Sequence, residues 1–299
     1  MVGDIMSSVL ASPSVRAAAR RQGINIVELA KKLNRKQITL DDLNPSLSAA
    51  PAAAVDMTGY WDVDHQQYGE IRAEATSKFD RIASANLSAA NSLIPQVTHH
   101  DQADMSSVEM LRAQLKQEAL SQEIKLTTLA FFVKALAVTL KQFPKFNASL
   151  SPDGEELYFK EFVHIGIAVD TDYGLMVPVI RDVDKKGLFA IAKEIADLAT
   201  RAKSRKIGPQ EMGGGSMTIS NLGGIGGTAF TPIVNPPEVA ILGITRTQMT
   251  PIWDGSEFKP KPMAPLDLSY DHRVINGADA AKFVATLAKY LSDPRYLMV

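Results

Sequence analysis

Residues 265–283 of this 299-residue chain read PLDLSYDHRVINGADAAKF. An extended, largely apolar run leads to Arg273, and a helical pattern follows it. Asp271, His272 and Arg273 therefore crowd the end of a buried strand, where each polar group must be hydrogen-bonded or used. Either Asp271 and Arg273 pair while His272 fills space, or His272 does chemistry. The residues alone leave both interpretations open.

Strand-like and helix-like patterns alternate around this stretch without a regular βαβ rhythm. Period-two alternation of apolar residues over 163–169 predicts a strand, and Ser106 to Glu109 has the spacing of a capping box. The predicted strands are 157–170, 175–180, 216–222, 239–246 and 265–273, and the predicted helices are 126–143, 188–205 and 278–291. This mixture indicates the α+β class, with a mixed sheet and helices packed on it.

A small head precedes this body. Ser12 to Ser14 has the pattern of a helix start, which predicts a helix over 15–21 that stops at Gly23. A second short helix is predicted over 38–43. Residues 44–55 read NPSLSAAPAAAV, a linker composition without charge or apolar periodicity. We expect a helical head at 10–43, a linker at 44–63 and a large domain at 64–299.

Composition excludes several classes of protein. The chain has 32 Lys and Arg against 33 Asp and Glu, a net charge of −1, so a general nucleic-acid binder is disfavoured. It has no cysteine, which removes disulfides and cysteine-based zinc sites and fits a reducing compartment. No apolar run is long enough to span a membrane. We expect the cytoplasm, or the mitochondrial matrix if the source is a eukaryote.

The remaining histidines and the glycine-rich segment suggest little chemistry by themselves. His65, His99, His100 and His164 lack the spacing of a zinc motif, so we expect no metal and treat them as exposed or structural. Residues 224–229 formally match a dinucleotide-binding pattern, but prolines follow where a helix is required. The glycines instead indicate close backbone approach beside a strand, which makes its Ser220 a candidate hydroxyl donor.

Several segments together resemble one family. DHRVINGADAAKF, at residues 271–283, is similar to the active-site signature of dihydrolipoamide acyltransferases, the E2 components of 2-oxo acid dehydrogenase complexes. The wider family includes chloramphenicol acetyltransferase. Residues 216–246 resemble a second family block, and the details are closer to the acetyl, pyruvate type than to the succinyl type. The resemblance implies a chloramphenicol acetyltransferase-like fold over roughly 64–299.

The head, residues 11–43, resembles a peripheral subunit-binding domain. Arg16 and Arg20 match basic residues with which such domains bind the E1 or E3 component. Lys31 to Lys36 occupy the family's glycine-rich loop, and Lys36-Gln37 stands where Gly-Arg is usual. The chain contains no Asp-Lys-Ala lipoylation motif. We expect the lipoyl group to come from another polypeptide or from a lipoyl domain missing from this chain.

The resemblance implies transfer of an acetyl group from S-acetyldihydrolipoamide to coenzyme A. In that reaction His272 is the general base, Ser220 donates a hydrogen bond to the oxyanion and Asn276 positions the site. Asn276 stands where the family more often has Asp. Asp271, Arg273 and Gly277 support the site, which needs neither a covalent acyl-enzyme nor a metal.

The resemblance also implies an assembly. His272 and Ser220 of family members face each other across a subunit boundary of a homotrimer, and trimers join through apolar C-terminal contacts into a cubic or dodecahedral core. The tail YLMV at 296–299 fits such a contact, unless it packs on its own domain. Two other functions stay open: an inactive E2-like scaffold, and a free-standing coenzyme A-dependent acetyltransferase acting on a small molecule.

Overall fold

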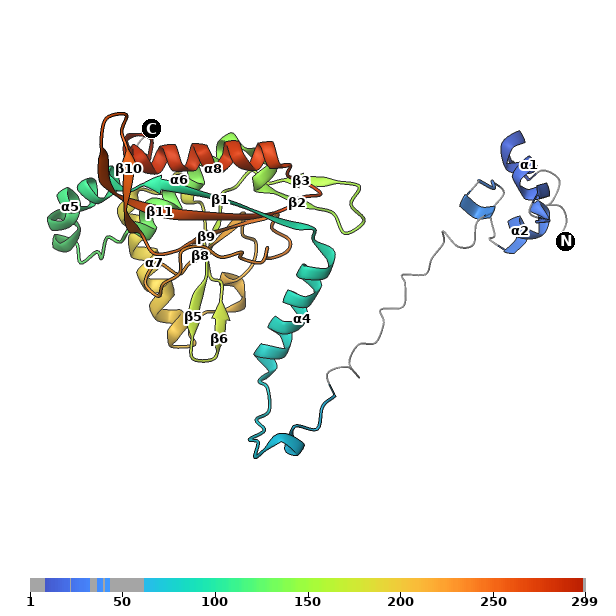
Figure 1. Cartoon of the computed structure of the whole chain (residues 1–299), viewed down its shortest axis with the longest axis horizontal. Helices are drawn as coiled ribbons and strands as arrows, with labels where there is room; N and C mark the ends of the chain where they lie inside the picture. The colour runs from blue at the N-terminus through green and yellow to red at the C-terminus, as the bar shows by residue number, and fades with distance from the viewer. Residues whose placement is uncertain (1–8, 22, 33–36, 40, 44–61, 298–299) are drawn as a thin grey trace. The chain divides into compact units, whose positions relative to one another are not determined.

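The computed structural model describes residues 9–21, 23–32, 37–39, 41–43 and 62–297. The chain divides into two compact units, residues 1–74 and 75–299 (Figure 1). Each unit has its own core and is described by itself. Of the predicted linker at 44–63, residues 44–61 lie outside the described residues.

The first helix of the head agrees with its prediction. Helix α1 (Pro13–Arg21) follows Ser12, whose hydroxyl accepts a backbone N–H of the first turn. Gly23 has a φ of +68°, and the N–H of Ile24 bonds back to the carbonyl of Ala19 at 2.9 Å. This left-handed residue ends the helix, as glycine does at many helix C-termini.

The predicted second helix over 38–43 is wrong. The second helix is α2 (Ile26–Lys32), whose start is capped by Asn25: its Oδ1 accepts the N–H groups of Val27 and Glu28. The predicted segment contains only a short 3₁₀ turn, η1 (Asp41–Leu43), because its apolar residues complete a small core instead of a helical face. That core comprises Val15, Ala19, Ala30, Ile38 and Leu43. A further turn, η2 (His65–Tyr68), lies near the end of this unit.

A seven-stranded mixed sheet organises the second unit, which confirms the predicted mixture of a sheet and packed helices. The strand order is β1-β11-β9-β8-β4-β7, and β10 pairs with β11 outside this path. The pairs β4-β8 and β8-β9 are parallel, and all others are antiparallel. The strands are β1 (Gln96–Asp104), β4 (Ile165–Ile167), β7 (Val179–Ile180), β8 (Met217–Asn221), β9 (Ala240–Ile244), β10 (Gln248–Trp253) and β11 (Phe258–Asp271).

The single strand predicted over 157–170 is wrong in its continuity. It consists of β3 (Leu157–Phe159), β4 and β5 (Val169–Thr171). The chain breaks because each piece has a different partner: β3 pairs with β2 (Ala148–Leu150), β4 with β8, and β5 with β6 (Gly174–Met176). Two small hairpins therefore flank the main sheet.

Helices surround the sheet, and one of them was not predicted. Helix α4 (Lys78–Leu93) begins with a capping box of Ser77 and Asp80, and Ala90 is its one buried residue. Figure 1 shows α4 projecting from the sheet. The other helices are α5 (Ser106–Ser121), α6 (Thr128–Gln142), α7 (Leu188–Lys203) and α8 (Gly277–Ser292), with 3₁₀ turns η3 (Pro144–Asn147), η4 (Val183–Lys185), η5 (Pro209–Glu211) and η6 (Pro294–Leu297).

The predicted capping box at Ser106 is wrong. Ser106 is the first helical residue of α5, and Met105 occupies the cap position without a side-chain bond. The carboxylate of Asp104 takes the capping role instead, because its Oδ1 accepts both the N–H and the hydroxyl of Ser106.

The two faces of the sheet differ in chemistry because successive side chains of a strand point to opposite sides. One set, which includes Ile219, Leu242 and Leu268, joins the main apolar core with α5, α6, α7 and α8. Within it Phe146 and Phe283 stack at 4.0 Å between ring centres. The opposite set is mostly polar and is called the polar face below. It comprises Thr98, His100, Thr218, Ser220, Gly243, Asp267, Ser269 and Asp271, together with the apolar Ile241, which packs with Ala90, Ile94 and Val234.

Removing Phe283 tests how strongly α8 is fixed to the core. Phe283→Ala leaves a cavity beside Phe146 and should lower the free energy of unfolding by about 3–5 kcal/mol. Urea denaturation at one fixed protein concentration measures this. Leu175→Ala, at a residue 57% exposed on β6, is the control and should change stability by less than about 0.5 kcal/mol. Equal losses in both variants would contradict the packing described here.

Candidate functional site

The turn after β11 is held by the carboxylate of Asp271, which is 2% exposed. Its oxygens accept the backbone N–H of Arg273 at 2.9 Å and the Arg273 guanidinium at 2.7–3.2 Å. The Asp271 carbonyl also accepts the N–H groups of Val274 and Ile275. The predicted Asp271–Arg273 pair therefore exists, and it shapes the turn from which His272 extends.

His272 does not fill space in the core. It is exposed, its backbone N–H donates to the carbonyl of Pro95 at 3.1 Å, and its ring lies 5.8 Å from that of Tyr270. The turn thus holds the His272 imidazole in a position where solvent or a substrate can reach it. This geometry favours the second of the two interpretations left open by the sequence.

Asn276 and Gly277 start the helix that follows. Asn276 is the N-cap of α8, and its Oδ1 accepts the N–H of Asp279 at 2.9 Å. Asn and Asp both cap helices well, which explains how Asn can stand in this position. Gly277 is the first residue of α8, with room for a side chain beside Tyr270. In this chain Asn276 thus fixes the short segment between His272 and the helix.

Ser220 lies on the polar face near the end of β8 and is half-buried. Its hydroxyl has no hydrogen-bond partner among the described residues. Opposite it is Gly243, where a Cβ atom would lie 2.7 Å from the ring of Phe230. The ring of Phe230 therefore occupies the space that a side chain at 243, opposite Ser220, would fill.

The glycine-rich segment folds back on the strand end. The carbonyl of Leu222 accepts the N–H groups of Ile225 and Gly226, and the guanidinium of Arg246 donates to the Ile225 carbonyl. Residues 222–239 contain no helix before β9 begins. This agrees with the exclusion of a dinucleotide site at 224–229.

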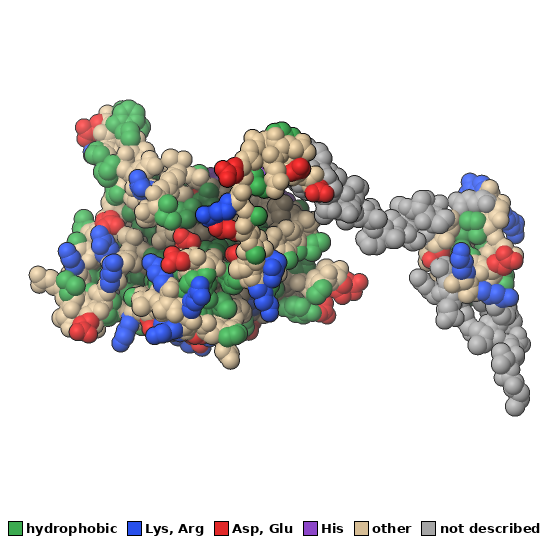
Figure 2. Space-filling model, turned by 90° about the horizontal axis from the view of Figure 1, so that it is seen from below, with side chains coloured by type: hydrophobic (Ala, Val, Ile, Leu, Met, Phe, Trp, Pro, Cys, Tyr) green, Lys and Arg blue, Asp and Glu red, His purple; other side chains and the backbone are tan. Residues whose placement is uncertain are grey.

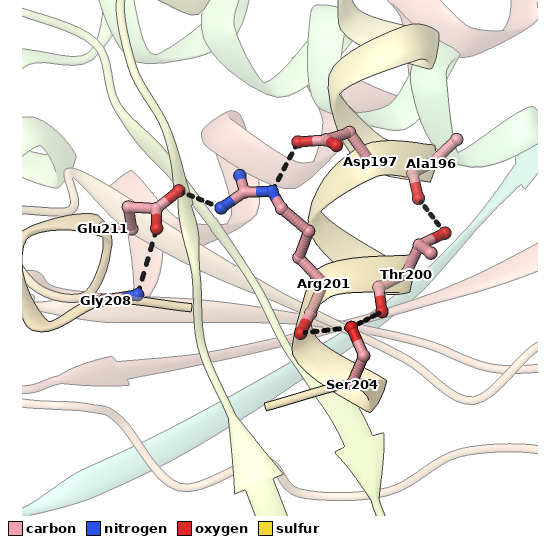
Figure 3. Close-up of polar contacts among 7 residues, drawn as sticks. All are labelled: Ala196, Asp197, Thr200, Arg201, Ser204, Gly208 and Glu211. Carbon is pink, nitrogen blue, oxygen red and sulfur yellow. Dashed lines mark hydrogen bonds and ion pairs between the residues drawn. The ribbon is translucent and has the colours of Figure 1, made fainter. Parts of the chain in front are cut away.

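The loop that leads into β8 is anchored to α7 (Figure 3). Arg201 contacts Asp197 at 2.7 Å on its own helix and Glu211 at 2.6 Å on η5. Glu211 also accepts the N–H of Gly208, and this bond and the arginine lower the pKa of its carboxyl. Because these groups are largely in water, the pairs direct the loop more than they stabilise the fold.

The structure does not bring Ser220 and His272 together within one chain. Ser220 is opposite Gly243, and Gly243 is opposite Asp267, so two strand spacings separate Ser220 from β11. His272 follows Asp267 by five residues. With about 4.8 Å between strands and about 3.3 Å per residue, the two backbones are about 19 Å apart. Their side chains together span less than half of that distance.

A buried carboxyl beneath Ser220 escaped the sequence analysis. Glu238 is 6% exposed, and its Oε1 accepts the hydroxyl of Thr218 at 2.9 Å. Its Oε2 has no partner among the described residues. Burial raises the pKa of Glu238 to about 7, against the opposing effects of Thr218 and Lys160. No sequence motif marks this pair, whose members are 20 residues apart.

The other histidines have structural contacts or none. His100 Nδ1 lies 2.6 Å from the buried carboxylate of Asp267, and His164 Nδ1 accepts the N–H of Asp182. His65 is exposed on η2.

Within the described ranges no group of three or more His, Cys, Asp or Glu residues is arranged to hold a metal. No helix in the same ranges combines the length and apolar character needed to cross a membrane.

The two head arginines differ in availability. Arg16 donates to the carbonyls of Val9 and Ala11, so its guanidinium is engaged within its own unit. Arg20 is exposed on α1.

Charges of both signs are interspersed on the face of the molecule that Figure 2 shows.

The C-terminal tail packs partly on its own domain. Leu297 is 8% exposed and joins the main core, and Tyr296 lies 5.2 Å from the ring of Tyr290. The alternative that the tail packs on its own domain therefore holds for Leu297, because η6 turns the chain back onto α8. Met298 and Val299 lie outside the described residues.

The raised pKa of Glu238 makes folding depend on pH. In the unfolded chain this carboxyl loses its proton near pH 4.5, whereas in the folded chain it keeps it to about pH 7. The group therefore lowers stability progressively as pH rises from about 4.5 to 7. Glu238→Gln should gain stability relative to wild type between pH 5 and pH 8, measured by urea denaturation. Glu118→Gln, on the exposed side of α5, is the control, and a pH-independent difference for Glu238→Gln would refute the assignment.

Comparisons with known proteins agree on one family. The model of the 2-oxoacid dehydrogenases acyltransferase catalytic domain matches residues 68–299. The dihydrolipoyllysine-residue acetyltransferase component of the pyruvate dehydrogenase complex of Pseudomonas aeruginosa is 44% identical over 98% of this chain and 55% of its own length. The corresponding Azotobacter vinelandii component is 44% identical over 98% of this chain and 48% of its own length. The chain thus spans about half the length of these relatives.

Solved structures give the same result. The structure from an investigation of a serine, a histidine and an asparagine in the mechanism of Azotobacter vinelandii dihydrolipoamide acetyltransferase has a TM-score of 0.78. It is 49% identical over 79% of this chain and 98% of its own. A structure of the cubic core of the pyruvate dehydrogenase multienzyme complex matches with the same values. The family model covers most of the chain and the relatives match nearly all of it, so the chain belongs to the family of 2-oxoacid dehydrogenase acyltransferases.

Proposed function

We propose that this chain transfers an acetyl group from S-acetyldihydrolipoamide to coenzyme A, in the core of a pyruvate-type 2-oxo acid dehydrogenase complex. One observation carries the proposal. The serine, histidine and asparagine studied in the Azotobacter vinelandii enzyme are separated by 52 and 4 residues. Ser220, His272 and Asn276 have the same residue types, order and spacing.

In this mechanism His272 removes the proton of the coenzyme A thiol as the sulfur attacks the thioester. Transfer of a thiol proton to an imidazole is uphill by about 2–3 kcal/mol in water, so fixed geometry must offset that difference. The Asp271–Arg273 pair and the Asn276 cap supply such geometry on the two sides of His272. The hydrogen bonds on both sides of His272 thus hold the turn that carries the base in one conformation.

Ser220 stabilises the tetrahedral oxyanion. Its hydroxyl has no partner in the described part of the chain, so its proton is free to point at a developing negative charge. Preorganised donors of this kind act mainly in the transition state. The proton then returns from His272 to the departing dihydrolipoamide sulfur, and no covalent acyl-enzyme forms.

The separation of Ser220 and His272 supports a site between subunits. About 19 Å within one chain excludes a direct meeting, so the serine of one copy must face the histidine of another. A homotrimer satisfies this arrangement at each of its boundaries. The exposed side of α4, with Phe79, Ile82 and Leu93, is a surface that such a neighbour would cover. We propose that trimers join into a cubic or dodecahedral core.

The head completes the proposal for the whole chain. Residues 10–43 would be a peripheral subunit-binding domain, residues 44–63 a linker and residues 64–299 the acyltransferase domain. Because Arg16 is engaged within the head, Arg20 is the arginine better placed to bind an E1 or E3 component. The lipoyl group would arrive on a lipoyl domain, either of another polypeptide or missing from this sequence. We place the protein in the cytoplasm, or in the matrix of a mitochondrion.

Acetyl transfer by single-residue variants tests the function. His272→Ala should lower kcat by about 100- to 10,000-fold, since a general base contributes that much. Ser220→Ala should lower it by about 100- to 1,000-fold. Steady-state assays with acetyldihydrolipoamide and coenzyme A measure both, with His65→Ala as the control histidine.

Two outcomes would reject the proposal. An assembled wild-type chain without acetyl transfer to coenzyme A from dihydrolipoamide would favour a scaffold. Transfer from acetyl coenzyme A to small-molecule acceptors alone would favour a free-standing acetyltransferase. The exposed His272, and the Ser220 hydroxyl without a partner among the described residues, favour catalysis over a scaffold.

A further inference from the structure

A buried side-chain bond lies directly behind Ser220 on the same strand. Thr218 and Ser220 are two residues apart on β8, so their side chains point to the same face of the sheet. The Thr218 hydroxyl donates to Glu238 Oε1 at 2.9 Å, and the two residues are 1% and 6% exposed. Among the described residues, this is the only side-chain hydrogen bond that β8 makes on that face. It lies two residues from Ser220, the proposed oxyanion donor.

Glu238 is itself fixed from several directions. Its backbone N–H donates to the carbonyl of Asn235 at 3.0 Å. A Cβ atom on Gly215 would lie 2.5 Å from Glu238 Oε1, so a side chain at 215 would push the Glu238 carboxyl from its present position. Lys160 Nζ donates to the Gly215 carbonyl at 2.9 Å. The carboxyl thus joins the loop before β9 to the start and the middle of β8.

Space for this bond is also reserved on the other side of β8. Gly166 of β4 lies opposite Thr218, and a Cβ atom there would approach Thr218 Oγ1 to 2.6 Å. A side chain at 166 would therefore require a shift of Thr218 or of its neighbour Val177. Two glycines, 166 and 215, therefore accommodate one hydrogen bond.

This arrangement is costly for stability. Glu238 Oε2 is buried without a hydrogen-bond partner in the described part of the chain, and such a group destabilises a fold relative to an apolar pair of similar shape. A strand that is already paired on both edges does not need this bond to form. This loss of stability is explained if the Thr218–Glu238 bond fixes a side-chain direction that backbone pairing does not determine.

We propose that Glu238 is a positioning residue for acetyl transfer: by holding Thr218, it fixes the end of β8 and with it the direction of the Ser220 hydroxyl. The inference rests on the proposed function of Ser220. Because Ser220 has no side-chain partner of its own in the described chain, its direction depends on this neighbouring anchor. Glu238 acts through Thr218 and touches no reacting atom.

A double-mutant cycle on the assembled full chain tests this coupling. Thr218→Val keeps the shape of the side chain but removes the bond, and it should lower kcat about tenfold with little change in the KM for coenzyme A. In a Ser220→Ala background the same substitution should change kcat by less than about twofold. Independent, multiplying effects in the two backgrounds would overturn the proposal.

Conservative and matched variants separate positioning from general stability. Thr218→Ser keeps a hydroxyl and should restore kcat to within about twofold of wild type. Glu238→Gln keeps an acceptor for Thr218 and should do the same. Thr139→Val removes another buried hydroxyl, on α6, and should leave kcat unchanged. A tenfold loss in Thr139→Val or in Thr218→Ser would contradict the proposal.

A measurement without catalysis keeps the two proposals distinct. Hydrogen exchange of peptides covering 216–222 should be faster in Thr218→Val than in wild type, with peptides of β11 unchanged. Unchanged exchange at 216–222 would overturn the positioning role even if the chain transferred no acetyl groups. If wild type transfers acetyl groups but the effects of Thr218→Val and Ser220→Ala on kcat multiply independently, the positioning role is refuted and the proposed function stands.

Discussion

The register of β11 is the constraint on which the rest of the structure depends. This 14-residue strand pairs with β1 on one edge and β9 on the other. Its alternate residues divide between the apolar core and the polar face. A slip of one residue would exchange the two sets, moving Leu268 out of the core and Asp267 into it. The same register sets the separation of Ser220 from His272.

Three buried carboxylates give the polar face its order. Asp271 shapes the turn that carries His272, Asp267 binds His100 and the N–H of Phe230, and Glu238 holds Thr218. Each of these acids is at least nine-tenths buried, which is tolerated only where bonds compensate. Hydrogen bonds of these acids thus hold the buried polar face in one arrangement.

Local features were predictable from the sequence, whereas contacts between distant segments were not. The strand, turn and helix around His272 agree with the structure, because apolar pattern, N-cap and glycine all lie within residues 265–283. The helix predicted at 38–43 failed because Ile38 and Leu43 fill a core whose other members lie elsewhere in the chain. Helix α4 was overlooked although Phe79, Ile82, Ala90 and Leu93 recur in it at helical intervals; all but Ala90 are exposed within this chain.

The candidate site shows the same division. His272, Ser220 and Asn276 stand in recognisable segments, whereas Glu238 and Thr218 meet only because β8 and the loop before β9 lie side by side. The polar face likewise emerges only once the pairing of β1, β11, β9 and β8 is known. A single sequence contains no local signal for such cross-strand pairs.

The central claim is that Ser220 and His272 act across a boundary between two copies of the chain. Co-assembly of Ser220→Ala chains with His272→Ala chains tests it most directly, because each inactive variant supplies the group that the other lacks. In an equal, randomly mixed trimer about one boundary in four holds both groups, so about a quarter of the wild-type acetyl transfer should return. Co-assembled chains with no more activity than either parent would contradict the account.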